Sequence, residues 1–392
     1  MYRCIVYDEK NNRKVLNLNI NSEEEVYSYA YKNKFKIVDI KERRFFFKGK
    51  KLKHKDLKVL SKEMSILLRS GCEISKILRI LIEESDKKVK VVLKEILRNI
   101  EKGNSIKDSF ENTKAFSNFY ISMIATGEMS GNLDDAMDKL ASYYDKEIKL
   151  KNKIVSILIY PAILMITMII CFVFILIFLV PNFEDVYADN NLKTPGLTQI
   201  LIWLSHLLRD HFLLIMIGNL IIIGGLIYLK NNSQKFSTAI NKLAFKLPVI
   251  KTLIQLIVSN KFIKALSILV SSGVQIVYSI EISAKVMSNQ YVYEKICKAN
   301  EFIKKGNSIG DSLKSVEELP SLLLSMIAIG EESGRLDTVL DTVTDYYENE
   351  LDSKLEIGTK YLENFITLFI GIAVGVIVIS MMVPMFDAVS AI

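Results

Sequence analysis

Proline and closely spaced cysteines are scarce in this chain. Its 392 residues include six prolines and four cysteines, and no two cysteines have the CxxC spacing of a zinc or redox site. The sequence therefore supports neither a metal site nor a disulfide framework, and we expect buried free thiols at Cys4, Cys72, Cys171 and Cys297. Half of the residues are apolar and the mean hydropathy is positive, which is too apolar for an ordinary soluble protein of several domains.

Catalytic motifs are also missing from the sequence. No GxxxxGK[ST] loop is present to hold a nucleotide phosphate, and His54, His206 and His211 have no partner histidine or cysteine at ligand spacing. We therefore expect a protein that is not an enzyme and that needs no cofactor and no metal. The first residues lack the apolar core of a signal peptide, so the first domain is expected to stay in the cytosol.

Three apolar blocks hold the excess hydrophobicity. The first, Ile154 to Val180, has 27 residues without a charged side chain, whereas about 20 helical residues cross a bilayer. A buried core helix is the alternative, but such a long uncharged run is unusual in one. The second and third blocks are Phe212 to Leu229 and Phe365 to Val383, and the third contains Gly371 and Gly375 at GxxxG spacing. Each block is predicted to be a membrane-spanning helix.

The basic residues predict the orientation of these spans. All lysines and arginines except Lys193 and Arg209 lie in residues 1–153 or 230–364. The net charge of +7 therefore indicates membrane topology, and no nucleic-acid partner is expected. Because lysine and arginine accumulate on the cytosolic side, residues 1–153 and 230–360 are expected in the cytosol and residues 181–211 outside.

A direct repeat supports the same topology. The sequence KGNSIKDSF at Lys102–Phe110 recurs as KGNSIGDSL at Lys305–Leu313, 203 residues later. GEMSGNLD recurs as GEESGRLD with the same separation, and SILLRSG recurs as SILVSSG with a separation of 202. Because the repeat includes a domain and the span after it, both copies have the same orientation. The unrepeated middle block must then return the chain to the cytosol.

Short motifs inside the repeat predict helix caps. In both copies a Gly-Asn step ends one helix, and a Ser-x-x-Asp box begins the next, at Ser105 with Asp108 and at Ser308 with Asp311. We assign these four residues as structural caps.

The two GExSG sequences are the candidate partner-binding sites. They contain Gly127, Glu128, Gly131, Gly330, Glu331 and Gly334. In one interpretation, Glu128 and Glu331 are carboxylates that contact a partner. The alternative is architectural: Gly127 and Gly330 end a helix, and Asp134 and Asp337 lie in the first turn of the next. Both interpretations explain the glycines, whereas capping explains the glutamates less well.

The predicted fold class is a mainly α, polytopic membrane protein with two repeated cytosolic helical bundles, three transmembrane helices and a small N-terminal ββαβ module. Each bundle should have about six helices. The basic stretch Lys48 to Lys58 is either a solvated linker or a contact with lipid headgroups. The predicted layout is 1–55 accessory module, 56–153 first domain, 154–180 first span, 181–211 extracytoplasmic loop, 212–229 second span, 230–360 second domain, 361–384 third span and 385–392 extracytoplasmic tail.

These motifs together resemble the inner-membrane platform family of type II secretion systems and type IV pili. The resemblance covers about residues 57–392 and rests on the repeated GExSG loops, the LLxSG helix end, the KGNS box and prolines at the span ends, Pro161, Pro181 and Pro384. The ββαβ start is similar to a module that many members carry. Members often have Glu-Pro at the head of the last span, whereas here Glu363 is followed by Asn364. Glu363 stays a candidate partner-binding residue.

The resemblance implies a non-enzymatic platform. Its expected partners are a hexameric cytosolic assembly ATPase, pilin or pseudopilin subunits, other inner-membrane assembly components, the lipid bilayer and further copies of itself as a homo-oligomer. A transporter or channel built from oligomerised three-span subunits is the alternative, and the uncharged spans argue against it. A membrane-anchored sensor ranks last, because the outside segment is short and has no cysteine framework.

Overall fold

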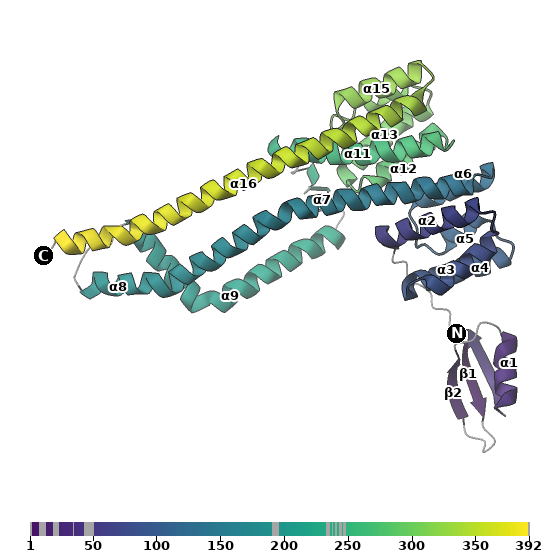
Figure 1. The fold of residues 1–392 in the computed structure, drawn as a ribbon, viewed down its shortest axis with the longest axis horizontal. Coiled ribbons are helices and arrows are strands. Elements are labelled where there is room, and N and C mark those ends of the chain that lie inside the picture. The colour runs from purple at the N-terminus through teal and green to yellow at the C-terminus, as the bar shows by residue number, and fades with distance from the viewer. Residues whose placement is uncertain are drawn as a thin grey trace. The chain divides into compact units, whose positions relative to one another are not determined.

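A computed structural model of the chain describes residues 2–7, 13–18, 23–33, 35–42, 51–189, 196–232, 236, 238–239, 241–242, 245 and 248–390 (Figure 1). Two compact units divide the chain. Unit 1 comprises Met1–Asp56 and Leu67–Ser117, and unit 2 comprises Leu57–Ile66 and Asn118–Ile392. Each unit is taken by itself below. Helices dominate both, as the predicted mainly α class requires.

The N-terminal part of unit 1 is the predicted ββαβ module. Its elements are β1 (Tyr2–Tyr7), β2 (Arg13–Leu18), α1 (Glu23–Lys32) and β3 (Lys36–Glu42). The strands form one antiparallel sheet in the order β2-β1-β3, so that β1 pairs with both neighbours (Figure 1). Val6 of β1 and Ala30 of α1 are buried, which places an apolar side chain of each element in the module's interior.

Three helices of the first repeat complete unit 1. They are α3 (Ile74–Glu84), α4 (Lys87–Glu101) and α5 (Ile106–Asn112). Apolar residues three and four apart make one buried stripe on each long helix, as at Ile77, Leu78 and Leu81 of α3. Val92, Leu93 and Ile96 make the facing stripe of α4.

The remaining helices of the first repeat belong to unit 2. They are the greater part of α2 (His54–Arg69), α6 (Asn118–Ser130) and α7 (Leu133–Phe174). The hydroxyls of Ser61 in α2 and Tyr120 in α6 form a buried hydrogen bond of 2.9 Å. The rings of Phe119 and Tyr143 lie 4.6 Å apart and join α6 to α7.

The second repeat forms a helical bundle within unit 2. Its elements are α11 (Pro248–Ser271), α12 (Ile276–Val286), α13 (Gln290–Lys304), α14 (Ile309–Leu313), α15 (Ser321–Glu332) and the start of α16 (Leu336–Ser390). Phe262 of α11, Leu323 of α15 and Tyr347 of α16 lie in its common core. The two predicted repeats therefore correspond to similar series of helices, α2–α7 and α11–α16.

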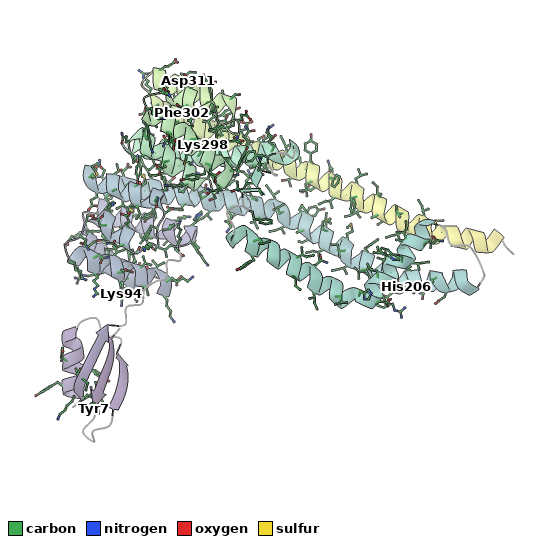
Figure 2. All side chains as sticks on the ribbon, turned by 180° about the vertical axis from the view of Figure 1, so that it is seen from behind. Tyr7, Lys94, His206, Lys298, Phe302 and Asp311 are labelled. Carbon is green, nitrogen blue, oxygen red and sulfur yellow. The ribbon has the colours of Figure 1, made fainter. Side chains whose placement is uncertain are left out.

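Long helices carry the chain away from the second bundle. α7 continues through a π-helical turn, η1 (Ile175–Leu179), into α8 (Val180–Asp189), and α9 (Gly196–Asn232) has a kink at His211. In Figure 1, α7 and α16 run side by side away from the bundle, and α9 contacts η1 and α8. His206 of α9 accordingly lies far from Lys298, Phe302 and Asp311 of the bundle in Figure 2. Helices thus occupy most of residues 181–211, whose position outside the membrane stays a prediction.

Among the described residues, three helical stretches are long and apolar enough to cross a membrane: Leu133–Asn182, Lys251–Ser271 and Leu336–Ile379. The first and third contain predicted spans, and their most apolar windows are 11% buried. Lys251–Ser271 is 61% buried because α11 is a core helix of the second bundle. The predicted middle span lies in α9, where the described side chains include the exposed Leu214, Ile217, Ile221 and Ile222.

The cysteines differ from the expectation of buried thiols. Cys171 is exposed, and Cys72 and Cys297 are half-buried; all three are free. Cys171 lies on the outer surface of the apolar part of α7, where a small apolar side chain is compatible with a hydrocarbon environment. The side chain of Cys4 lies outside the described residues, as do residues 43–50 of the basic stretch.

Candidate partner-binding site

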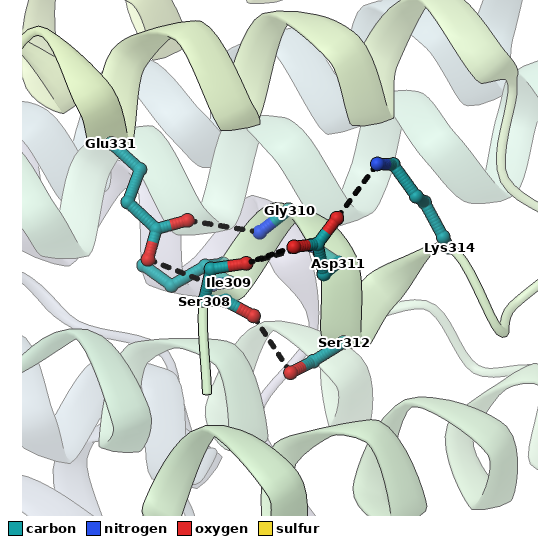
Figure 3. A network of polar contacts seen from close by, with 7 residues as sticks. All are labelled: Ser308, Ile309, Gly310, Asp311, Ser312, Lys314 and Glu331. Carbon is teal, nitrogen blue, oxygen red and sulfur yellow. Dashed lines mark hydrogen bonds and ion pairs between the residues drawn. The ribbon is translucent and has the colours of Figure 1, made fainter. Parts of the chain in front are cut away.

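Glu331, near the end of α15, binds the beginning of α14. One carboxylate oxygen accepts a hydrogen bond from the Ile309 amide at 2.8 Å and the other accepts one from the Gly310 amide at 3.0 Å (Figure 3). Amides in the first turn of a helix have no partner within that helix, and a carboxylate also suits the positive end of the helix dipole. In the second repeat, the glutamate of GExSG therefore holds two helices together.

The Ser-x-x-Asp boxes cap helices in both repeats. Ser105 Oγ accepts a hydrogen bond from the Asp108 amide at 3.0 Å, and Ser308 Oγ accepts one from the Asp311 amide at 3.2 Å. Lys314 lies 2.7 Å from the Asp311 carboxylate, and its hydrogen bond, followed by that of Ser308, lowers the pKa of Asp311 below its usual value (Figure 3). The capping residues thus keep a negative charge at the start of α14.

The glycines of GExSG have different positions from those expected. Gly127 and Gly330 do not end their helices: both lie inside the last turn, and α6 and α15 continue to Ser130 and Glu332. Gly334 ends α15 instead, with φ +65, and its amide donates to the Glu331 carbonyl at 3.2 Å. The expectation was wrong because the helix continues past the first glycine of the motif, by three residues in α6 and by two in α15.

Gly127 and Gly330 instead allow the next helix to pack closely. A Cβ at Gly127 would lie 2.9 Å from Ala136 Cβ and 3.0 Å from Leu133 Cα of α7. At Gly330 it would lie 3.2 Å from Leu336 Cα of α16. These distances are shorter than ordinary van der Waals contact, so the first glycine of each motif fixes the angle between two helices.

An exposed apolar side chain marks the tip of the first loop. Met129 follows Glu128 and is 89% exposed. Glu128 is half-buried, and the residues after Met129 are exposed up to Asn132. A single exposed methionine is common on a protein surface, but here it lies in the last turn of α6, next to the short connection to α7. Sequence reasoning did not single it out, although an apolar residue inside a polar loop was visible as a signal.

The remaining predicted residues lie elsewhere. Glu363 is a half-buried residue of α16, 27 residues after its first residue, Leu336, and therefore about 40 Å along the helix. Pro161 is buried inside α7, Pro181 is the second residue of α8, and Pro384 lies inside α16. The structure therefore does not bring Glu363 to the GExSG loops, and each of the three prolines lies within a helix.

Pro181 follows the π-helical turn and leaves one of its carbonyls without a backbone donor at π-helical spacing. In a π-helix the amide of residue 181 would donate to the carbonyl of Leu176, five residues earlier, but proline has no amide hydrogen. Ser205 of α9 donates its hydroxyl to that carbonyl at 2.5 Å. An unpaired carbonyl is costly in hydrocarbon, so this bond stabilises the packing of α9 on η1. Ser205 was not identified from the sequence.

A cluster of charged residues joins the two repeats. Lys146 of α7 lies 2.8 Å from Glu348 of α16, and Lys264 of α11 lies 3.1 Å from the same carboxylate. Glu147 pairs with Lys261 of α11 at 3.4 Å. Glu147 and Lys264 are buried, so this contact is part of the interior of unit 2. No sequence motif marks it, because three of its five residues, Lys146, Lys261 and Glu348, are replaced at the equivalent positions by Asn349, Val59 and Asp145.

The chain was compared with known protein families and curated proteins. The profile of a family described as type II secretion system (T2SS), protein F, matches residues 60–181 and 262–384. The matches begin 202 residues apart and end 203 apart, the two separations of the sequence repeat.

Relatives come from two kinds of assembly. A type II secretion system protein F from Xanthomonas campestris pv. campestris is 30% identical over 85% of this chain and 82% of its own length. A type IV pilus assembly protein PilC from Thermus thermophilus is 32% identical over 73% of this chain and 71% of its own length. A type II secretion system protein F from Vibrio cholerae is 28% identical over 73% of this chain and 70% of its own length.

Proposed function

Because the chain belongs to the type II secretion system protein F family, we propose that it is a non-enzymatic membrane platform for the assembly of a type IV pilus or a secretion pseudopilus. Its relatives carry the names of both systems. The candidate membrane helices and the family agree with a multi-pass protein of the inner membrane.

The proposed topology has both repeats in the cytosol and three spans. The first span is the apolar part of α7 with η1, the second is the part of α9 after His211, and the third is the apolar part of α16. The N-terminus is then cytosolic and the C-terminus extracytoplasmic. This assignment leaves α11 in the second bundle, where its side chains are mostly buried.

The observation that carries the proposal is the continuity of two helices. α16 runs without interruption from Leu336 to Ser390, about 80 Å at 1.5 Å per residue, and so includes both the end of the second bundle and an apolar stretch. α7 does the same for the first repeat. A helix that joins a cytosolic domain to a span transmits a displacement of the domain into the bilayer.

The partners follow from the family and this geometry. A hexameric cytosolic assembly ATPase would move the repeats, and pilin or pseudopilin subunits would leave the bilayer beside the spans. Two unequal repeats give an off-centre adaptor that a symmetric ring can displace. The GExSG loops are the proposed docking points on the ATPase side: Glu331 shapes its loop, and Met129 and its polar neighbours supply exposed contacts. Glu128 keeps the role of a proposed contact residue.

Deleting the gene should leave pilin made and processed but not assembled into filaments. Gly358→Pro tests the coupling step, because proline would interrupt α16 between the second bundle and the span. Gly358 is exposed with nothing within 4 Å of an added Cβ, so Gly358→Ala is a matched control that keeps the helix. We expect filaments with alanine and none with proline, at equal protein levels in the membrane. Normal filaments with the proline variant would contradict the coupling.

A further inference from the structure

The contact between the two repeats buries residues of the first repeat whose equivalents in the second repeat are exposed. Tyr143 of α7 is 4% exposed, and Lys264 Nζ lies 5.7 Å from the centre of its ring. The equivalent residue of the second repeat, 203 positions later, is Tyr346, which is 49% exposed. A contact with two-fold symmetry would bury both tyrosines alike. The internal contact is therefore heterologous.

The same difference extends along both helices. Leu150 and Ile154 of α7 pack against the core of the second repeat. Their equivalents in α16, Ser353 and Ile357, are exposed. We call the exposed side of α16 that faces away from α7 the open ridge; it comprises the exposed Tyr346, Asn349, Ser353 and Ile357 and the half-buried Glu350.

The surface that receives α7 also has an exposed equivalent. Lys261 and Lys264 of α11 have side chains that are 24% and 8% exposed, because α7 covers them. The equivalent residues of α2 are Val59, 44% exposed, and Lys62, whose side chain is 53% exposed. We call the exposed side of the first repeat the open face; it comprises Val59, Lys62, Ile66, Asp145 and Lys149.

Within each chain, α7 thus docks on the surface of the second repeat that contains α11. The equivalent ridge of α16 and the equivalent face of the first repeat stay exposed. We propose that the open ridge of one chain docks on the open face of a second copy, so that the contact inside the chain is repeated between chains. The partner is this chain itself. Both surfaces lie in unit 2.

The chemistry of the internal contact is preserved at the proposed one. Lys264 over the Tyr143 ring has its equivalent in Lys62 and Tyr346, a second cation and aromatic pair.

The membrane limits the form of such an assembly. All chains are inserted in one direction, so neighbouring copies are related by rotation about the membrane normal. A heterologous contact repeated by such a rotation closes into a ring. The proposed assembly is therefore cyclic, with two repeats from each chain along its circumference. It needs the like orientation of the two repeats but does not depend on which filament the protein serves.

Cross-linking tests the pairing and its asymmetry. Val59→Cys and Glu350→Cys are equivalent to the internal pair of Lys261 and Glu147, which lies at 3.4 Å. Full chains carrying one cysteine each, with the four native cysteines replaced by serine or alanine, are co-expressed with different tags and treated with a short bismaleimide. We expect linked dimers from the mixture and none from Val59→Cys or Glu350→Cys alone. Absence of the mixed product would overturn the proposal, as would equal linking of Val59→Cys to itself.

A disruptive variant gives an independent readout. Tyr346→Glu places a charge on the open ridge, and Tyr278→Glu of α12 is the matched control because Tyr278 is 50% exposed and lies outside both surfaces. The mass of the purified full chain in detergent is measured by light scattering over a range of concentrations. We expect about tenfold weaker self-association for Tyr346→Glu and no change for Tyr278→Glu. A monomeric wild type, or an unchanged mass of Tyr346→Glu, would refute the ring, whatever its effect on filaments.

Discussion

Lys146 Nζ lies 2.8 Å from the carboxylate of Glu348 and so joins the last helix of the first repeat to that of the second. Burial would raise the pKa of Glu348, but the hydrogen bond from Lys146 and the charge of Lys264 outweigh it and lower the pKa below 4.5. Burial lowers the pKa of Lys264, although Glu348 opposes that change. Glu348 is therefore the anion that compensates two lysines at the contact between repeats.

Removing this anion should destabilise the chain. Glu348→Gln removes the carboxylate that pairs directly with the buried Lys264 and leaves only the charge of Glu147 near it, which we expect to cost about 3 kcal/mol of unfolding free energy. Chemical denaturation of the purified full chain in detergent measures it. Glu101→Gln is the control, because Glu101 pairs with Arg79 on the surface, and we expect no measurable change there. Equal midpoints for Glu348→Gln and wild type would show that the cluster does not hold the repeats together.

The same cluster predicts a dependence on acid. The folded pKa of Glu348 lies below its ordinary value of 4.5, so its contribution to stability is complete above 4.5 and is lost as the pH falls through the lower folded value. The melting temperatures of wild type and Glu348→Gln should therefore differ most near neutral pH and converge in acid. A series of thermal melts from neutral to acidic pH checks this. A constant difference across the series would exclude Glu348 as the titrating group.

Loss of the Glu331 carboxylate should lower the stability of the fold, whether or not it also weakens the binding of a partner. Glu331→Ala leaves the amides of Ile309 and Gly310 without their acceptors, at an expected cost of about 1–2 kcal/mol. Glu331→Gln keeps one acceptor and should cost less. The exposed neighbour Glu332 gives the control Glu332→Ala, with no expected change in melting temperature. If Glu331→Ala melts like wild type but loses the ATPase in co-purification, a direct contact is the better account of this residue.

Much of the architecture could be predicted because the same short capping and turn motifs occur in both repeats. The Ser-x-x-Asp boxes at Ser105 and Ser308, the Gly-Asn steps and the first helical residues Leu133 and Leu336 all depend on neighbours in the sequence. The ββαβ module followed from alternating apolar residues and turn residues in the same way. Hydrogen bonds within one or two turns decide such features, so the local order of residues reveals them.

The contacts between helices could not be predicted in this way. Glu331 bonds to residues 21 and 22 positions earlier, and Ser205 bonds to Leu176 across two helices. The pair of Lys146 and Glu348 is set by how the repeats pack, and position 349, the equivalent of Lys146, is asparagine. The last turn of α15 was also misplaced, because the first glycine of GExSG serves close packing and Gly334 takes the left-handed conformation. Packing of distant segments decides all four.

Small residues at the start of GExSG should be irreplaceable for a steric reason. Gly127→Ala places a methyl group 3.0 Å from the backbone of Leu133, so the two helices must move apart, and we expect a loss of about 1–3 kcal/mol. Gly330→Ala meets Leu336 and Val339 at slightly longer distances and should lose less. Gly358→Ala, in open space on α16, should instead stabilise by about 0.5–1 kcal/mol. Thermal unfolding of the three variants tests this order, and a neutral Gly127→Ala would show that α6 and α7 are not closely packed.

The like orientation of the repeats gives the last prediction. Lys102 and Lys305 are exposed equivalents 203 residues apart, and Asp185 is an exposed residue of α8 at the other end of the first span. In a background without native cysteines, Lys102→Cys and Lys305→Cys should both resist a membrane-impermeant maleimide in intact spheroplasts and react in inverted vesicles. Asp185→Cys should show the reverse pattern, because one crossing separates it from each lysine. Crossing of the membrane by α7 alone would place the two repeats on opposite sides. They lie on one side only if α9 also crosses. Labelling of Lys102→Cys and Lys305→Cys from opposite sides would therefore show that α9 does not cross the bilayer. It would also contradict the proposed transmission of movement through α7 and α16 and the proposed ring.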